Sequence, residues 1–218
     1  HAQTPSPEQA RPDSPAPKET APEPEKMTAG VPSASIQKSR KDLSLLTAMI
    51  EEISGPSSSS EIILMILRFA SEIMNRAMVF LAREHEVGGL GQFGLILKNG
   101  SADQLIRNVR IPLTEPSCFK NVVANGQTFR GVLEKNSWNE YLVQQLGGHW
   151  PLEVLVAPLV SDGKVIAILY GDNAPHQQKI ENTEGLEAFI RVAGFAFGKA
   201  ILERKLQATR GKVSGQVN

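Results

Sequence analysis

Residues 152–173, with the sequence LEVLVAPLVSDGKVIAILYGDN, constrain the fold more than any other segment. Two apolar runs flank the dipeptide Asp162-Gly163. Asp-Gly between β-rich segments is typical of a two-residue type I′ hairpin loop, because both loop residues need a positive φ. Few polar residues occur on either face of this hairpin, so both faces must be buried. The sequence therefore predicts a central sheet with helices on at least one face.

The tight turn also predicts the register of the hairpin. It pairs Val160 with Val165, Leu159 with Ile166, Pro158 with Ala167 and Ala157 with Ile168. In this register one face holds Ala167 and Gly171 with Val154, Val156 and Leu169, and the other holds Leu155, Leu159, Ile166, Ile168 and Tyr170. We expect helices on the face with the small residues. We also expect the strand outside Pro158 to be absent or bulged there, because proline has no N–H to donate.

Composition limits the class of protein. The 218 residues, 41% hydrophobic and 21% charged, are enough for one domain with a sizeable core. A formal net charge of zero argues against a nucleic-acid partner held by a broad basic surface. The single cysteine, Cys118, excludes an internal disulfide and a cysteine metal cluster, which fits a reducing cytoplasm. We expect no signal peptide, and no apolar run approaches the roughly 20 residues of a membrane span.

The domain organisation follows from shifts in composition. Residues 1–35 contain eight of the fourteen prolines and read as a disordered linker, with a proline-rich recognition peptide as the alternative. Residues 36–57 are predicted to form a connecting helix, residues 58–207 the folded domain and residues 208–218 a flexible tail. Since a linker opens the chain at His1, we expect an upstream domain in the same protein.

Three segments have apolar residues at helical spacing, namely 38–53, 58–75 and 182–207. Ser58 and Glu61 are spaced as a capping box at the start of the second. The first segment either packs on its own domain or forms a dimer seam, and Gly194 and Gly198 would let another helix approach the third. The residues predicted at a homodimer interface are Leu43, Leu46, Ile50, Ile53, Ala193 and Phe197.

Between these helices the sequence predicts strands at 77–83 and 87–97, short helices at 116–124 and 138–146, and an extended segment at 127–133. The glycine-rich stretch 88–94 lacks the Gly-Lys-Ser/Thr and the following helix of a phosphate-binding loop. Glycines within a strand more often indicate a bulge or the close approach of another backbone or a ligand. Here they could let Phe93 and its neighbours wall a cavity.

The order of these elements, the segment IPLTEPSCFKNVVANGQTFRG at 111–131, the hairpin and the closing helix resemble a GAF domain. The chain also resembles the GAF-like domains that follow a response-regulator receiver or a DUF4388 (PATAN) region in bacterial signalling proteins. The resemblance implies an α+β fold with a mostly antiparallel sheet, the first and last helices side by side on one face, and a ligand pocket on the other. GAF domains either bind small molecules or serve as dimerisation and contact modules.

The resemblance does not identify a ligand. The cyclic-nucleotide signature and the cysteines of the free-methionine sulfoxide reductases are absent, and no bilin, haem or other cofactor site is recognisable. Cys118 is either a redox sensor or attachment point near a helix start, or a packed cysteine. His85, His149 and His176 lack metal-ligand spacing, and no nucleophile and base are joined by a motif. We therefore expect a protein that is not an enzyme.

The function predicted from the sequence is a sensory module that binds an unknown small ligand and relays the change through its helices. The alternative is a ligand-free module for dimerisation or for contact with another protein. Aromatic bodies with a few polar side chains are the usual composition of a small-molecule pocket, although the same aromatics would also serve as an ordinary core. The predicted ligand-binding residues are Gln92, Phe93, Phe119, Arg130, Trp138, Tyr141, Trp150 and Tyr170, with Asn136 as a further polar candidate.

Overall fold

The computed structural model describes residues 43–214, except residues 45, 49, 54, 56, 57 and 98, with side chains to residue 209. The predicted linker 1–35, the start of the connecting helix and the last residues of the predicted tail lie outside this range. Helical residues between 43 and 53 precede the elements α2 (Ser59–Ser71), β1 (Arg76–Ala82), β2 (Glu86–Phe93), α3 (Ala102–Asn108), β3 (Arg110–Pro112), α4 (Cys118–Asn125), β4 (Phe129–Gly131), α5 (Ser137–Gln145), β5 (Val154–Ser161), β6 (Lys164–Asp172) and α6 (Glu184–Ser214).

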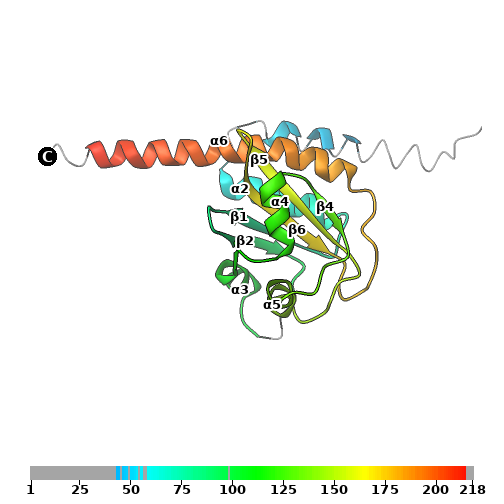
Figure 1. Cartoon of the computed structure of the whole chain (residues 1–218). Coiled ribbons are helices and arrows are strands. Elements are labelled where there is room, and N and C mark those ends of the chain that lie inside the picture. The colour runs from blue at the N-terminus through cyan, green and yellow to red at the C-terminus, as the bar shows by residue number, and fades with distance from the viewer. Residues whose placement is uncertain are drawn as a thin grey trace, which may run out of the picture.

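Six strands form one sheet in the order β3-β2-β1-β6-β5-β4, and each neighbouring pair is antiparallel. Helices α2 and α6 lie side by side on one face, and α3, α4 and α5 lie towards the other (Figure 1). The predicted α+β architecture, with the first and last helices of the domain together on one face, is therefore confirmed. Strand β6 lies in the middle of the sheet between β1 and β5, β5 has only the short β4 on its outer side, and both faces of this hairpin are buried.

The hairpin turn has the predicted geometry, but the predicted register beyond it is wrong. Asp162 and Gly163 have φ values of 49° and 71°, and Ser161 pairs with Lys164 and Val160 with Val165. A bulge follows, so that Ile166 is the extra residue and Leu159 pairs with Ala167. One inserted residue moves every later side chain of β6 to the opposite face relative to β5.

The bulge changes which residues share a face. Ala167 and Leu169 do face α2 and α6 as predicted, but their companions from β5 are Leu155, Ala157 and Leu159. Val154 and Val156 lie on the other face, together with Ile168 and Tyr170. The expectation for Pro158 is confirmed, because β4 pairs only with residues 154–156 and ends before the proline.

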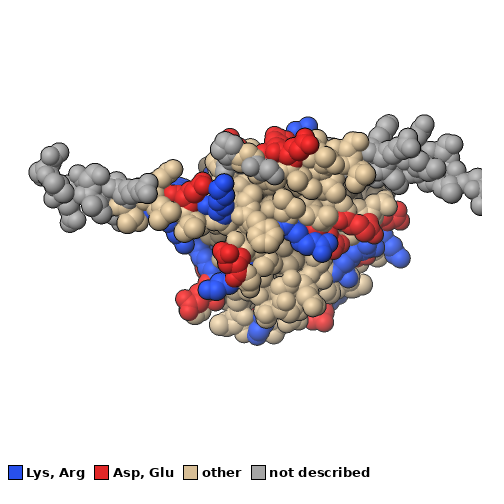
Figure 2. All heavy atoms as spheres, turned by 90° about the horizontal axis from the view of Figure 1, so that it is seen from above, with Lys and Arg blue, Asp and Glu red and all other residues tan. Residues whose placement is uncertain are grey.

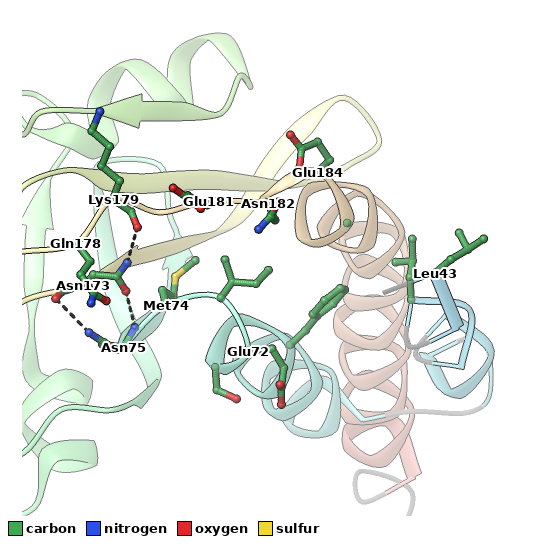
Figure 3. A pocket seen from close by; sticks show the side chains of 15 residues that line it. Leu43, Glu72, Met74, Asn75, Asn173, Gln178, Lys179, Glu181, Asn182 and Glu184 are labelled. Atoms are coloured by element: carbon green, nitrogen blue, oxygen red, sulfur yellow. Dashed lines mark hydrogen bonds between the residues drawn. The ribbon is translucent and has the colours of Figure 1, made fainter. Parts of the chain in front are cut away.

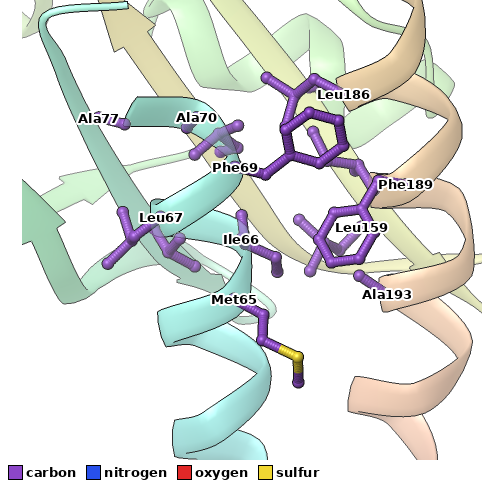
Figure 4. Packing of buried hydrophobic residues seen from close by; sticks show 14 of the residues in the cluster. Met65, Ile66, Leu67, Phe69, Ala70, Ala77, Leu159, Leu186, Phe189 and Ala193 are labelled. Carbon is purple, nitrogen blue, oxygen red and sulfur yellow. The ribbon is translucent and has the colours of Figure 1, made fainter. Parts of the chain in front are cut away.

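An aromatic contact joins the two helices on the first face. The rings of Phe69 in α2 and Phe189 in α6 meet edge to face at 5.4 Å between centroids, over the buried side chains of Ile66 and Leu159 (Figure 4). Aromatic pairs in this geometry stabilise a core by about 0.5–1.5 kcal/mol beyond the area they bury. The helix pair is therefore part of the core of the domain.

Gly194 and Gly198 of α6 serve a different contact from the predicted one. A Cβ on Gly194 would meet backbone atoms of Val160, and one on Gly198 would meet the side chain of Ser161. The close approach is thus between α6 and the end of β5, and it does not involve a second helix. The absence of a side chain lets α6 lie directly on the hairpin.

The glycines of β2 have the predicted role. A Cβ on Gly89 would overlap the backbone of Ile106 in α3, and the ladder between β1 and β2 has a bulge at Leu90. These glycines therefore mark both a bulge and the close approach of another backbone. The helix that approaches, α3, was not predicted, because its seven residues ADQLIRN read as a polar segment.

Candidate functional site

A cavity of about 540 Å³ opens among α4, β4 and the start of α5. Half of its lining residues are polar and uncharged, and its apolar wall comes from Val122, Phe129 and Leu133. The lining residues are Pro116, Ser117, Cys118, Lys120, Asn121, Val122, Asn125, Gln127, Thr128, Phe129, Leu133, Glu134, Asn136 and Asn139. We call this space the α4 cavity.

Asn139 fixes the geometry of the α4 cavity. Its side chain is buried, and its Oδ1 accepts a hydrogen bond of 2.9 Å from the backbone N–H of Cys118 at the start of α4. Its Nδ2 donates to the carbonyl of Glu134 at 2.9 Å, and its own N–H donates to Oδ1 of the cap residue Asn136. One amide therefore joins the N-termini of α4 and α5, so the position of one helix depends on that of the other.

Two polar residues at the start of α4, Ser117 and Lys120, differ in whether their side chains have a hydrogen-bond partner among the described residues. Ser117 Oγ is buried and has no hydrogen-bond partner among the described residues, although the residue stands at the N-cap position of α4. A buried hydroxyl without a partner is costly, so it favours a ligand group or water that can hydrogen-bond to it. Lys120 donates from its ammonium group to the carbonyl of Thr114 at 2.8 Å. The α4 cavity is consequently suited to a polar molecule of low charge.

Cys118 does not have the environment of a reactive thiol. Burial raises the pKa of its thiol well above the ordinary range, and this outweighs the opposing backbone hydrogen bond. The thiol is therefore protonated at neutral pH, whereas the thiolate is the nucleophile and the form that oxidises readily. Of the two readings, the structure favours the packed cysteine over the redox sensor.

Phe119 connects the α4 cavity to the core beneath it. It follows the lining residue Cys118, is fully buried, and its ring lies 4.9 Å from that of Phe80 and 6.3 Å from that of Tyr170. Tyr170 donates its hydroxyl proton to Oδ2 of Asp172 at 2.8 Å. Burial and the neighbouring carboxylate raise the pKa of Tyr170, so it remains a hydrogen-bond donor.

Asp172 belongs to a buried ion pair with Arg76. Nε of Arg76 lies 2.6 Å from Oδ1, Nη2 lies 3.1 Å from Oδ2, and the two side chains are 5% and 0% exposed. Arg76 also donates to the carbonyls of Leu146 and His149, while Asp172 accepts from the N–H of Ala174. We call Arg76, Tyr170 and Asp172 the buried triad. It ties the start of β1 to the end of β6 and to the segment after α5.

The predicted ligand-binding residues do not gather around one cavity. Phe119 and Tyr170 are core residues, whereas the side chains of Phe93 and Arg130 are 38% and 40% exposed. Gln92 donates to Asp103 and accepts from the N–H of Leu95.

The remaining three predicted residues are aromatic and lie near α5. Trp138 and Tyr141 pack against each other edge to face, and Trp138 donates to Glu115. Trp150 lies under Lys135. None of the eight lines the α4 cavity, although Phe119 and Arg130 directly follow the lining residues Cys118 and Phe129.

The predicted interface residues fall into two groups. Ile53, Ala193 and Phe197 are buried in the core of the chain itself, and Ile50 is partly buried against it. Leu43, which is 64% exposed, and Leu46 line a groove of about 1030 Å³ with the end of α2 and the loop 173–185. Figure 3 shows Asn75 and Asn173 joined by hydrogen bonds at one side of this groove, and Glu72, Glu181 and Glu184 around it.

Two other kinds of feature are absent from the described part of the chain. No group of three or more His, Cys, Asp or Glu side chains is placed to hold a metal ion there. Across the same residues, no helix is both long and apolar enough to cross a membrane.

The comparisons with known proteins bear on the fold. No family model and no curated protein matches the chain. The GAF domain of a phosphoenolpyruvate-protein phosphotransferase from Coxiella burnetii is similar, with a TM-score of 0.59 and 13% identity over 77% of this chain and 96% of that one. The GAF domain of a two-component sensor histidine kinase from Bacillus halodurans is also similar, with a TM-score of 0.50 and 20% identity over 68% of this chain and 97% of that one.

A third similar structure is an enzyme. It is a free methionine-R-sulfoxide reductase from Neisseria meningitidis in complex with its substrate, with a TM-score of 0.53 and 14% identity over 76% of this chain and 93% of that one. At these identities the likeness establishes the fold and leaves the chemistry to the residues of this chain.

Proposed function

We propose that this chain, which folds as a GAF-like domain, is a sensory module of a bacterial signal-transduction protein and binds a small polar molecule in the α4 cavity. Regulatory proteins among the similar structures, a sensor histidine kinase and a phosphotransferase, support a signalling role. In this proposal the protein is cytoplasmic, an upstream response-regulator or DUF4388 (PATAN) region precedes the linker, and the domain is not itself an enzyme. The reductase of the same fold supplies the alternative that a ligand is also a substrate.

The observation that carries the proposal is the buried Ser117 Oγ, which has no hydrogen-bond partner in the described part of the chain and lies in a cavity lined by amide side chains. Asn and Gln both donate and accept hydrogen bonds, so they suit a ligand with several polar atoms and little net charge. The apolar wall of Val122, Phe129 and Leu133 would cover an apolar part of the same molecule.

A route for the signal leads from the α4 cavity to the helices on the other face. A ligand that moves α4 would shift Phe119, which packs on Tyr170, and Tyr170 is hydrogen-bonded to Asp172. Asp172 holds Arg76, the first residue of β1, which follows α2 closely in sequence. A change at the buried triad would thereby alter the end of α2 and its packing on α6.

The test uses one variant that fills the α4 cavity and one matched control. Thr128 is exposed and lines the cavity, whereas Val132 is 70% exposed on the same segment and does not. Native mass spectrometry of the purified wild type would detect any retained small molecule. Thermal-shift measurements with free amino acids, nucleosides and nucleotides would then find a molecule that stabilises the fold by mass action.

We expect Thr128→Trp to remove the bound mass and the thermal shift, and Val132→Trp to keep both. If the wild type retains no small molecule and none of the probes raises its Tm, the ligand proposal fails. It also fails if Thr128→Trp binds as the wild type does, since the ligand would then lie elsewhere.

The second candidate function is a homodimerisation module, favoured by the exposed Leu43 and by the exposed Phe195, Leu202 and Leu206 along α6. Leu46→Glu with Ile50→Glu tests it. We expect a folded monomer by circular dichroism and sedimentation if these residues lie at an interface, and a destabilised protein if they only cover their own core. A wild type that sediments as a monomer at high micromolar concentration would exclude this candidate.

A further inference from the structure

A second groove, away from the α4 cavity, runs along the outer half of α6. It has a volume of about 910 Å³, and its walls come from the start of α2, the outer ends of β1 and β2, and α6. Its floor is apolar and is formed by Ile63, Leu81, Leu90, Ile166, Phe197 and Ile201. All of these except Phe197 are only partly buried, so the floor remains accessible to a partner. We call this space the basic groove because of its rim.

The rim of the basic groove is cationic. Five positively charged residues line it, namely Arg83, Arg107, Arg110, Arg204 and Lys205, and no acidic residue does. Figure 2 shows Lys and Arg atoms gathered where α6 leaves the domain, with acidic atoms among them. The chain as a whole has a net charge of zero, so this concentration of positive charge is local.

Only part of this charge is neutralised within the domain. Glu86 pairs with Arg83 at 2.8 Å and lies 3.7 Å from Arg110. Arg107, Arg204 and Lys205 have no carboxylate within 4 Å among the residues that the structure describes. These three cations are exposed and are available to the acidic groups of another molecule.

The fold brings the cations together from distant parts of the sequence. Gly89 has no side chain, which lets α3 approach β2 and places Arg107 at the rim. On the opposite wall, Phe197, Ile201, Arg204 and Ala208 recur at spacings of three and four residues along α6. They therefore form one stripe about three turns long, in which the apolar Phe197 and Ile201 are followed by the cation Arg204.

We propose that the basic groove binds an amphipathic helix of a partner protein, with its apolar residues on the floor and its acidic residues against the rim. A helix laid beside α6 would present apolar side chains at i, i+4 and i+7, which is the usual mode of helix-in-groove recognition. Nucleic acid would match the cations but not the apolar floor. A protein surface that binds a membrane projects its apolar residues into the lipid, whereas the apolar floor of this groove is concave.

The experiment uses the whole chain and three labelled peptides of about 18 residues, long enough to form a helix. The first has leucines on one face and flanking glutamates, the second has lysines in place of the glutamates, and the third is a scramble of the first. Fluorescence anisotropy gives the Kd for each at two salt concentrations. Arg204→Glu with Lys205→Glu leaves three cations and two carboxylates on the rim, and Arg191→Glu with Lys199→Glu makes the same charge change on α6 outside the groove.

We expect the acidic amphipathic peptide to bind, more weakly at higher salt, and the rim variant to weaken it about tenfold or more. The control variant should bind within about twofold of the wild type, and the lysine peptide and the scramble should not bind. Circular dichroism of both variants checks that they remain folded.

Other results would overturn the proposal. The proposal is wrong if the acidic peptide does not bind at high micromolar concentration, if the scrambled peptide binds equally well, or if the rim variant has an unchanged Kd. If anionic phospholipid vesicles or a DNA duplex displace the peptide and bind the wild type more tightly, the groove serves that partner and the peptide proposal is wrong.

Discussion

Replacement of Gly194 by alanine tests how closely α6 lies on the sheet. A Cβ at this position would be 2.5 Å from the carbonyl oxygen of Val160 and 2.8 Å from its nitrogen. Ordinary contact begins near 3.4 Å, so α6 or the end of β5 must move by about 0.9 Å to admit the methyl group. Neither backbone can turn aside as a side chain would, because both belong to regular elements.

The expected change in the free energy of unfolding of Gly194→Ala combines two opposing effects. Overpacking a core in this way costs about 1–3 kcal/mol. Alanine in place of glycine within a helix stabilises the fold by about 1 kcal/mol. Gly185 is the matched control, since it lies in the first turn of the same helix and its added Cβ would meet Phe69 at an unstrained 3.6 Å. Gly185→Ala should therefore stabilise by up to about 1 kcal/mol, while Gly194→Ala should destabilise by up to about 2 kcal/mol.

Urea unfolding followed by circular dichroism measures the difference between these two variants, which we expect to be about 1–3 kcal/mol. A third variant locates the contact, because Gly198→Ala would meet the side chain of Ser161. Adding Ser161→Gly removes that clash, so the double variant should recover part of the stability lost by Gly198→Ala. If Gly194→Ala is as stable as Gly185→Ala, α6 does not press on β5 and the packing described here is wrong.

Three further predictions concern the turn, the buried triad and the cysteine. Gly163→Val places a β-branched residue at a φ of 71° and should cost about 1–3 kcal/mol, seen as a lower Tm, whereas an unchanged melting curve would contradict the tight turn. Asp172→Asn leaves Arg76 buried without a counter-ion and should cost about 3–5 kcal/mol in urea unfolding, while Asp162→Asn in the exposed turn should be neutral. Because burial raises the pKa of Cys118, the thiol stays protonated in the fold while the unfolded chain ionises above pH of about 8.5, so stability should fall by up to about 1.4 kcal/mol per pH unit above that value. Cys118→Ala should lose this part of the pH dependence, and an identical pH profile in the variant would refute the assignment.

Local patterns were sufficient to predict much of the fold. The Asp-Gly turn, the apolar strands beside it and the capping box at Ser58 each depend on neighbours within a few residues, and the structure has all three. The resemblance to GAF domains then gave the sheet and the pair of helices on one face. The bulge at Ile166 was not predictable in this way, because no turn or breaker residue marks it in the strand.

The candidate site was less predictable, because its residues are distant in sequence or unremarkable in type. Arg76 and Asp172 read as the ordinary polar ends of two strands, and only the pairing of β1 with β6 brings them together. The α4 cavity is lined by amides and small polar residues, whereas the sequence prediction followed aromatic residues. Of the three polar candidates named from the sequence, Asn136 alone lines this cavity, where it caps α5 and accepts from the N–H of Asn139.

The strand order has a consequence for how the chain is made. Strand β6, which closes the sheet by lying between β1 and β5, is the last to be synthesised, so β1 keeps an unpaired edge until residue 172 has left the ribosome. Val79 and Phe80 on that edge are fully buried in the finished domain but face solvent or other chains before then. A nascent chain that stops after α5 thus holds an open, apolar strand, and only the arrival of the C-terminal hairpin removes this risk of aggregation.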